Sequence, residues 1–146
     1  MTKTDNRPVG VGLIGLGTIG TGVAKVLAQN AAVIEARLGF PLPLVRIADL
    51  DTETDRGVEL SGIQFDSDSA ALIRDPRVDI VLELIGGYEP AKRFILEAIG
   101  AGKHIVTANK ALLALYGKEI FAAAREGDVD IAVEAAVGGR SGRAHL

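Results

Sequence analysis

The stretch that most constrains the fold of this chain runs from residue 9 to residue 22, where an apolar segment leads into three spaced glycines. Residues 9–14 are all apolar or glycine, which is long enough for one buried strand. Gly15, Gly17 and Gly20 follow in the spacing G-x-G-x-x-G, and a helical pattern begins directly after Gly17. A strand, a glycine turn and a helix in this order are typical of a dinucleotide-binding fold.

Each glycine has a distinct task in such a fold. Gly15 allows the strand to turn sharply into the helix, and Gly20 allows that helix to pack closely against the strand. Gly17 leaves room for a pyrophosphate beside the backbone, and the first turn of a helix offers unpaired N–H groups and a partial positive charge. We therefore predict that Gly15, Gly17, Thr18, Ile19 and Gly20 bind the pyrophosphate of a dinucleotide. The alternative is a glycine-rich turn without a ligand.

Composition excludes several other classes of protein. The chain has 146 residues, enough for one domain with a core of its own, and its net charge of −3 offers no basic surface for nucleic acid or an anionic membrane. The absence of cysteine excludes a disulfide scaffold and a thiolate metal site. No apolar run reaches the ~20 residues needed to cross a bilayer, and residues 1–8 do not lead into a signal-peptide core. We therefore expect a cytoplasmic protein.

Predicted strands and helices alternate along the remaining chain. Strands are expected at 9–14, 44–49, 78–85, 104–107 and 129–137. Helices are expected over 18–38, from Ser67 or Ser69 to Ile73, over 90–99 and over 110–125, while residues 51–66 are expected to be irregular. This alternation predicts an α/β fold of the Rossmann type, in which a doubly wound parallel sheet is covered by helices on both faces in three layers.

In a doubly wound sheet, ligands bind beyond the carboxyl ends of the strands. Asp49 ends the second predicted strand, where an acid can accept hydrogen bonds from the adenosine ribose, although an ordinary solvated turn residue is an equal alternative. Gly86 and Gly87 follow the third strand. Glu83 interrupts that strand, and we favour a strand-end residue that faces solvent or a backbone donor over a polar group near the cofactor.

Lys110 is the candidate catalytic residue. It stands in the first turn of a predicted helix capped by Asn109, where the helix dipole disfavours a cation. Either it is a solvated surface lysine, or it faces a cofactor and a substrate. In the second case its ammonium group could bind a carbonyl or hydroxyl oxygen, or transfer a proton as a hydride moves.

Several of these stretches resemble the N-terminal nucleotide-binding domain of the homoserine dehydrogenases. They are residues 11–20, 81–87 and 102–113, and residues 134–139 follow in the expected order. The resemblance implies reversible reduction of aspartate semialdehyde to homoserine with NAD(P)H, in the pathway to threonine, methionine and isoleucine. It implies a domain over residues 9–139, between a polar leader (1–8) and a tail (140–146). In full length, it implies a homodimer.

The resemblance also implies roles for particular residues. Gly86 and Gly87 would lie near the nicotinamide with Thr107, Asn109 and Lys110, and Lys110 would stand where cofactor and substrate meet. A sodium ion is implied as well, with Glu134 and the backbone carbonyls of Val137 and Gly139 among its ligands.

Two features depart from the family pattern. Many members place an arginine directly after the acid of the second strand, where it favours a 2′-phosphate, whereas this chain has Leu50 between Asp49 and Asp51. The two negative charges predict NAD rather than NADP as the cofactor. The family's substrate and dimerisation domain is missing from this sequence, so we expect the fragment to be inactive alone.

Two other functions are compatible with the fold. A non-catalytic module that senses redox state through a bound dinucleotide needs no Lys110. The cofactor domain of a sugar or amino-acid dehydrogenase carries Glu-Lys-Pro at the matching strand, whereas this chain has Asn109-Lys110-Ala111. The homoserine dehydrogenase interpretation is therefore favoured.

Overall fold

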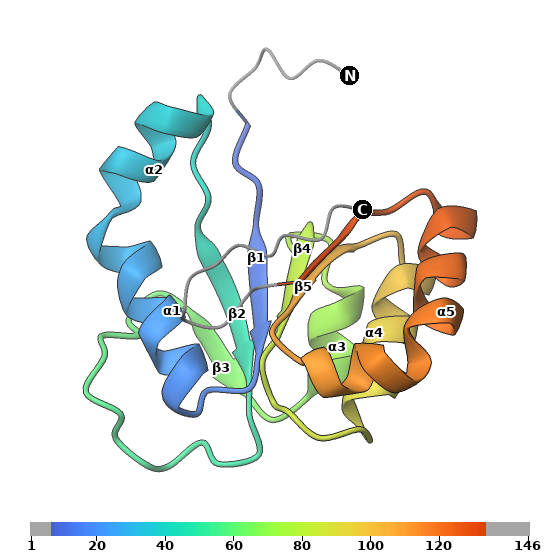
Figure 1. The fold of residues 1–146 in the computed structure, drawn as a ribbon. Helices are drawn as coiled ribbons and strands as arrows, with labels where there is room; N and C mark the ends of the chain where they lie inside the picture. Colours follow the sequence, from blue (N-terminus) through green and yellow to red (C-terminus); the bar gives the residue numbers. More distant parts are fainter. Residues whose placement is uncertain (1–6, 134–146) are drawn as a thin grey trace.

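The computed structural model describes residues 7–133, which form one parallel sheet with helices on both faces (Figure 1). The elements in chain order are β1 (Val11–Ile14), α1 (Thr18–Gln29), α2 (Ala31–Leu38), β2 (Leu44–Ala48), β3 (Gln64–Asp66), α3 (Ser69–Arg74), β4 (Ile80–Glu83), α4 (Ala91–Gly100), β5 (His104–Thr107), α5 (Lys110–Gly127) and β6 (Ile131–Val133). The strand order is β3-β2-β1-β4-β5-β6, and all neighbours are parallel. The order reverses at β1, so the predicted doubly wound topology is confirmed.

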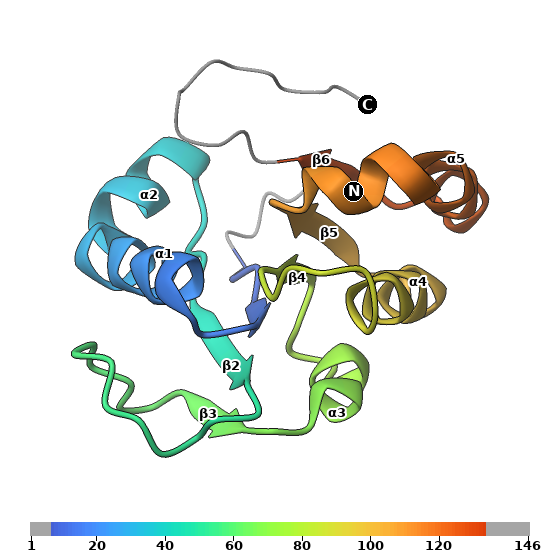
Figure 2. The same ribbon diagram turned by 60° about the horizontal axis from the view of Figure 1, so that its bottom comes forward.

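The three layers are visible when the sheet is seen closer to edge-on. In Figure 2, α1 and α2 lie on one side of the sheet, and α3, α4 and α5 lie on the other. The central strand β1 is buried along its whole length, which explains its uninterrupted apolar sequence. Leu72, Ile95 and Ile120 belong to a core cluster contributed by α3, α4 and α5, while Leu13 and Ala24 belong to a smaller cluster that includes α1.

The prediction of one helix over residues 18–38 is wrong, because two helices meet at Asn30. The Asn30 N–H donates to the carbonyl of Val26 at 3.0 Å, and its side-chain amide donates to the same oxygen at 3.2 Å, which ends α1. Its own carbonyl then accepts from Ile34 at 2.9 Å and begins α2. Asparagine competes with helical backbone bonding through such local contacts, and the apolar periodicity across it conceals the break.

Two short elements also differ from expectation. Residues 64–66 form β3 within the stretch predicted as irregular. The sequence shows no strand signal there because only Phe65 is apolar, and the strand forms through its pairing with β2 alone. Helix α3 is capped by Asp68, whose carboxylate accepts from the Ala71 N–H at 2.9 Å, rather than by Ser67 or Ser69. The predicted strand at 104–107 has the observed bounds, and Asn109 caps α5 as predicted.

A buried ion pair joins β2 to the segment that follows α3. The Asp75 carboxylate accepts from Arg77 at 2.6 Å (Nη2) and 3.0 Å (Nε), and from Arg46 Nη1 at 3.4 Å. The Arg77 hydrogen bonds, more than any other contact, hold the pKa of Asp75 well below its ordinary value. The ionised form of Asp75 is therefore favoured in the folded chain.

Acid is expected to destabilise the fold through Asp75. Because its folded pKa lies below its unfolded pKa, its stabilising contribution is complete above about pH 4 and is lost as the pH falls further. Asp75→Asn should lower the free energy of unfolding at pH 7 by about 2 kcal/mol. It should also flatten the loss of stability between neutral and acidic pH. Urea unfolding at neutral pH and at acidic pH tests this. Asp130→Asn is the control, because the Asp130 side chain is 92% exposed. An acid sensitivity of the Asp75 variant equal to that of the parent would refute the assignment.

Candidate functional site

The carboxyl ends of the central strands lie together at one edge of the sheet. The strand register pairs Ile14 with Ala48 on one side and with Glu83 on the other, and it pairs Glu83 with Thr107. The segments that follow these four residues therefore begin side by side. They contain the predicted site residues Gly15 to Gly20, Asp49 and Leu50, Gly86 and Gly87, and Asn109 and Lys110. The structure thus brings these residues to the same edge of the sheet.

The three glycines of the turn after β1 occupy different environments. Gly15 has a φ of +104°, and a Cβ there would lie 2.7 Å from Cγ2 of Ile85. A Cβ on Gly20 would lie 2.0 Å from the carbonyl oxygen of Gly15. A Cβ on Gly17 would meet nothing within 4 Å. Gly15 and Gly20 therefore serve the sharp turn and the close helix packing, as predicted, while Gly17 faces open space at the start of α1.

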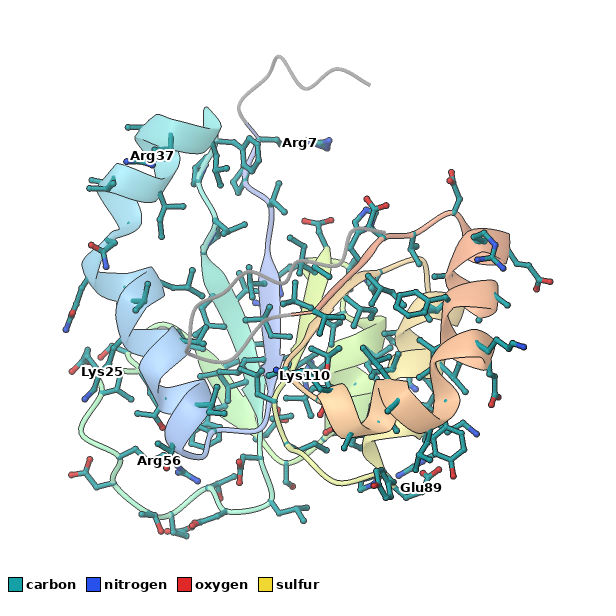
Figure 3. All side chains as sticks on the ribbon, viewed as in Figure 1. Arg7, Lys25, Arg37, Arg56, Glu89 and Lys110 are labelled. Carbon is teal, nitrogen blue, oxygen red and sulfur yellow. The ribbon has the colours of Figure 1, made fainter. Side chains whose placement is uncertain are left out.

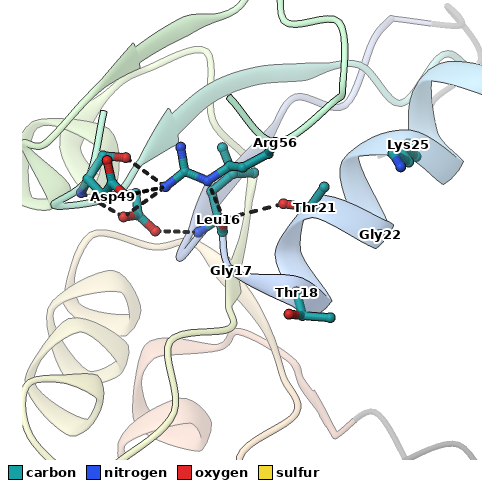
Figure 4. A pocket seen from close by; sticks show the side chains of 9 residues that line it. Leu16, Gly17, Thr18, Thr21, Gly22, Lys25, Asp49 and Arg56 are labelled. Atoms are coloured by element: carbon teal, nitrogen blue, oxygen red, sulfur yellow. Dashed lines mark hydrogen bonds and ion pairs between the residues drawn. The ribbon is translucent and has the colours of Figure 1, made fainter. Parts of the chain in front are cut away.

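Two hollows flank the first turn of α1. The Asp49 hollow has a volume of about 620 Å³ and is lined by Leu16, Gly17, Thr18, Thr21, Gly22, Lys25, Asp49, Asp51 and Arg56 (Figure 4). The Lys110 hollow has a volume of about 370 Å³ and is lined by Ile19, Glu83, Leu84, Ile85, Gly86, Ala108, Asn109, Lys110 and Ala111. Thr18 lines one hollow and Ile19 the other. The helix N-terminus, which carries the unpaired N–H groups, therefore lies between them.

The Asp49 carboxylate is tied to the glycine turn. Its Oδ2 accepts from the Leu16 N–H at 2.6 Å, and its Oδ1 accepts from the Asp51 N–H at 2.8 Å. Figure 4 shows Arg56 against both Asp49 and Leu16, and Arg56 Nη2 lies 3.5 Å from Asp49 Oδ1. Asp49 is half-buried, whereas the neighbouring Leu50 is 92% exposed. Asp49 is therefore an ordered carboxylate at the wall of the hollow rather than a freely solvated turn residue.

Sequence analysis missed Arg56. Its Nε donates to the Leu16 carbonyl at 2.7 Å, and its Nη2 donates to the Asp51 carbonyl at 2.7 Å, so it joins the loop after β2 to the glycine turn. A hydrogen bond from the Thr54 hydroxyl lowers the pKa of Asp51 in the same loop. No motif or periodicity marks Arg56 in the sequence, because it lies in an irregular loop that only the tertiary fold returns to the site.

The Lys110 hollow is formed by the segments after β4 and β5. Figure 3 shows Lys110 at the start of α5, where it is exposed. Asn109 caps this helix by accepting from the Leu112 N–H at 3.1 Å, and its Nδ2 donates to the Gly87 carbonyl at 2.6 Å. The predicted residues Gly86, Asn109 and Lys110 therefore line one hollow, and Gly87 adjoins it through its hydrogen bond with Asn109. Thr107 is fully buried beneath it.

We predicted that Glu83 faces either solvent or a backbone donor, and the structure excludes solvent. Glu83 is fully buried, and its Oε2 accepts from the N–H groups of Ile85 at 3.1 Å and Gly86 at 3.4 Å. The expectation of a backbone donor as its partner is confirmed. The strand-end position alone does not reveal burial, because the residues that cover Glu83 come from β5 and from the following turn.

The predicted sodium ligands Glu134, Val137 and Gly139 lie outside the described residues. Within residues 7–133, no group of three or more His, Cys, Asp and Glu side chains is arranged to hold a metal ion. None of the helices in this same range has the length and hydrophobicity that a membrane crossing requires.

Comparison with known proteins decides the family. The family model described as "Homoserine dehydrogenase, NAD binding domain" matches residues 15–134 of this chain. The chain belongs to the homoserine dehydrogenase family. The homoserine dehydrogenase of Neisseria gonorrhoeae is 47% identical over 140 residues, covering 91% of this chain and 30% of that protein. That of Bacillus subtilis is 39% identical over 133 residues, covering 91% of this chain and 31% of that protein.

Solved structures agree with this assignment. The homoserine dehydrogenase from Thiobacillus denitrificans superimposes with a TM-score of 0.83 at 45% sequence identity, covering 90% of this chain and 30% of that chain. The Rossmann-type fold and the oxidoreductase family are thereby established. The chain spans about 30% of the length of these relatives, and the matching family model describes an NAD-binding domain.

Proposed function

We propose that this chain binds NAD across the start of α1 and is the cofactor domain of a homoserine dehydrogenase. The observation that carries the proposal is the pair of hollows on either side of the α1 N-terminus, with open space over Gly17 between them. A dinucleotide consists of two nucleosides joined by a pyrophosphate, and this arrangement matches its three parts. The donors also fit, since a helix N-terminus offers N–H groups and positive charge to the pyrophosphate.

The residue roles follow from this placement. Gly15, Gly17, Thr18, Ile19 and Gly20 hold the pyrophosphate through the turn and the first N–H groups of α1. Asp49 faces the adenosine ribose from the wall of its hollow and retains acceptor capacity, because an ionised carboxylate offers about four lone-pair sites.

The nicotinamide lies in the Lys110 hollow. Gly86 and Asn109 line this hollow, Gly87 is tied to Asn109 by a hydrogen bond of 2.6 Å, and Thr107 is buried beside them. When bound there, NAD supplies the hydride acceptor, and NADH the donor, for interconversion of an aldehyde and an alcohol. Lys110 is exposed at this hollow, so its ammonium group is free to bind the substrate oxygen and to move a proton at that atom. This position favours a dehydrogenase over a sensing module, which has no use for Lys110.

The charges of the Asp49 hollow favour NAD over NADP. Asp49 and Asp51 place two carboxylates at its wall, and Leu50 offers no cation. Arg56 offsets part of this charge. Its N–H groups, however, already donate to the carbonyls of Leu16, Asp51 and Thr54, at 2.7, 2.7 and 2.9 Å. A 2′-phosphate therefore meets two carboxylates whose charge Arg56 offsets only in part, without a free arginine fork to receive it. The other cation of the lining, Lys25, stands on α1 away from Asp49 (Figure 4).

Parallel calorimetric titration of the chain with NAD and with NADP tests this proposal. NAD is expected to bind about tenfold more tightly, since one like-charge contact near a protein surface costs about 1 kcal/mol or more. Tighter binding of NADP would show that the charge argument is wrong while leaving the dinucleotide site in place. No binding of either nucleotide by the folded chain would contradict the site itself.

The whole protein's properties are part of the same proposal. We assign the dinucleotide-binding domain to residues 9–139, with residues 1–8 and 140–146 as flanking segments. In full length the protein would interconvert aspartate semialdehyde and homoserine, for threonine and methionine biosynthesis in the cytoplasm, as a homodimer with a sodium ion. Family membership supports these assignments.

A further inference from the structure

A buried glutamate, Glu83, belongs to the lining of the Lys110 hollow, and the proposed chemistry does not use its carboxylate. Glu83 ends β4, and its exposed fraction is 0%. Burying a carboxylate is costly unless hydrogen-bond donors surround its oxygens, so its partners reveal what the side chain does. An apolar residue of similar size would fill the same space without this cost.

Both oxygens of Glu83 have partners on segments that form the hollow. Oε1 accepts from the Thr107 hydroxyl at 2.6 Å, which joins β4 to β5. Oε2 accepts from the N–H groups of Ile85 at 3.1 Å and Gly86 at 3.4 Å, in the turn that follows β4. The carboxylate therefore holds one wall of the hollow and contacts the end of the strand that leads to the other wall.

The network continues to the helix that carries Lys110. The Thr107 hydroxyl oxygen accepts from the Asn109 N–H at 3.0 Å. Asn109 caps α5 through the Leu112 N–H and donates from Nδ2 to the Gly87 carbonyl at 2.6 Å. Glu83, Thr107 and Asn109 thus close a ring of hydrogen bonds between the glycine turn after β4 and the first turn of α5.

We propose that Glu83 is a positioning residue that sets the separation between the Gly86–Gly87 turn and Lys110. It does so by holding the turn amides and the Thr107 hydroxyl at the same time, so that both of its oxygens are engaged within the protein. The nicotinamide end of the site depends on this separation, whereas the adenosine end, on the other side of the α1 N-terminus, does not. This inference rests on the proposed function, because it assigns the nicotinamide to the Lys110 hollow.

Two ligands distinguish positioning from a general structural role. NAD reaches both hollows, whereas ADP-ribose lacks the nicotinamide and reaches only the pyrophosphate and adenosine parts. Glu83→Met keeps the length of the side chain and removes its acceptors. It is expected to raise the Kd for NAD about tenfold and to change the Kd for ADP-ribose by less than about twofold. Glu83→Gln keeps an acceptor for the turn amides and should retain most of the NAD affinity.

A matched pair at Thr107 gives an independent readout if Glu83→Met does not fold. Thr107→Val is nearly isosteric and removes only the hydroxyl, and it should reproduce the selective loss of NAD affinity. Thr107→Ser keeps the hydroxyl and should restore the parent ratio of NAD to ADP-ribose affinity. Thermal unfolding of each variant shows which ones are folded.

The outcomes separate this inference from the proposed function. Equal weakening of both ligands, or no change in either, would assign Glu83 a structural role alone and overturn the inference. A parent chain that binds NAD no more tightly than ADP-ribose would also overturn it, while leaving the dinucleotide site intact. A folded parent chain that binds neither ligand would contradict the proposed function itself.

Discussion

Gly20→Ala is expected to destabilise the fold by about 3 kcal/mol or more, even though alanine is the better helix former. The reason is the contact between α1 and the turn after β1. A Cβ at position 20 would lie 2.0 Å from the carbonyl oxygen of Gly15, which belongs to the backbone and cannot rotate away. The helix must therefore move away from β1, and the core contacts of Leu13 and Ala24 are lost with it.

Gly22→Ala is the matched control, because it makes the same substitution in the same helix. A Cβ on Gly22 would meet nothing within 4 Å. Alanine there should raise the free energy of unfolding by about 0.5–1 kcal/mol through helix propensity alone. Urea unfolding of the two variants beside the parent chain measures both effects. Equal stability of the two variants would show that the close approach at Gly20 does not contribute to the free energy of unfolding.

Much of the fold follows from the sequence because the central strands are buried on both faces. β1 and β5 are bounded by glycines or turn residues, so their positions and the parallel arrangement follow from apolar runs and spacing. The break at Asn30 could not be predicted in this way. A capping asparagine in the middle of an apolar repeat changes the direction of the chain without changing the periodicity.

The site could be predicted wherever a residue follows a strand directly. The residues at the ends of β1, β2, β4 and β5 reach one edge because the parallel register places them there. Arg56 and the network around Glu83 could not be foreseen. Both depend on contacts between side chains and backbone groups that form only after the loops have folded. No local sequence pattern encodes such contacts.

Gly17→Val and Gly17→Ser are both expected to weaken NAD binding by about 100-fold, which corresponds to about 2.7 kcal/mol. Gly17 is the residue before α1, and the space over it is open, since a Cβ there would meet no atom within 4 Å. In the proposed complex this space holds the pyrophosphate. Any side chain at position 17 would then displace the ligand without disturbing the protein core.

The two substitutions differ in their effect on the helix, which separates binding from folding. Gly17 is the N-cap of α1, where serine is a favoured residue and valine costs about 1 kcal/mol. The serine variant should therefore be as stable as the parent chain and still lose NAD, as calorimetric titration and thermal unfolding would show together. ADP-ribose should lose the same affinity, because it shares the pyrophosphate, in contrast to its expected indifference to Glu83→Met. Parent-like NAD affinity in the serine variant would place the pyrophosphate elsewhere.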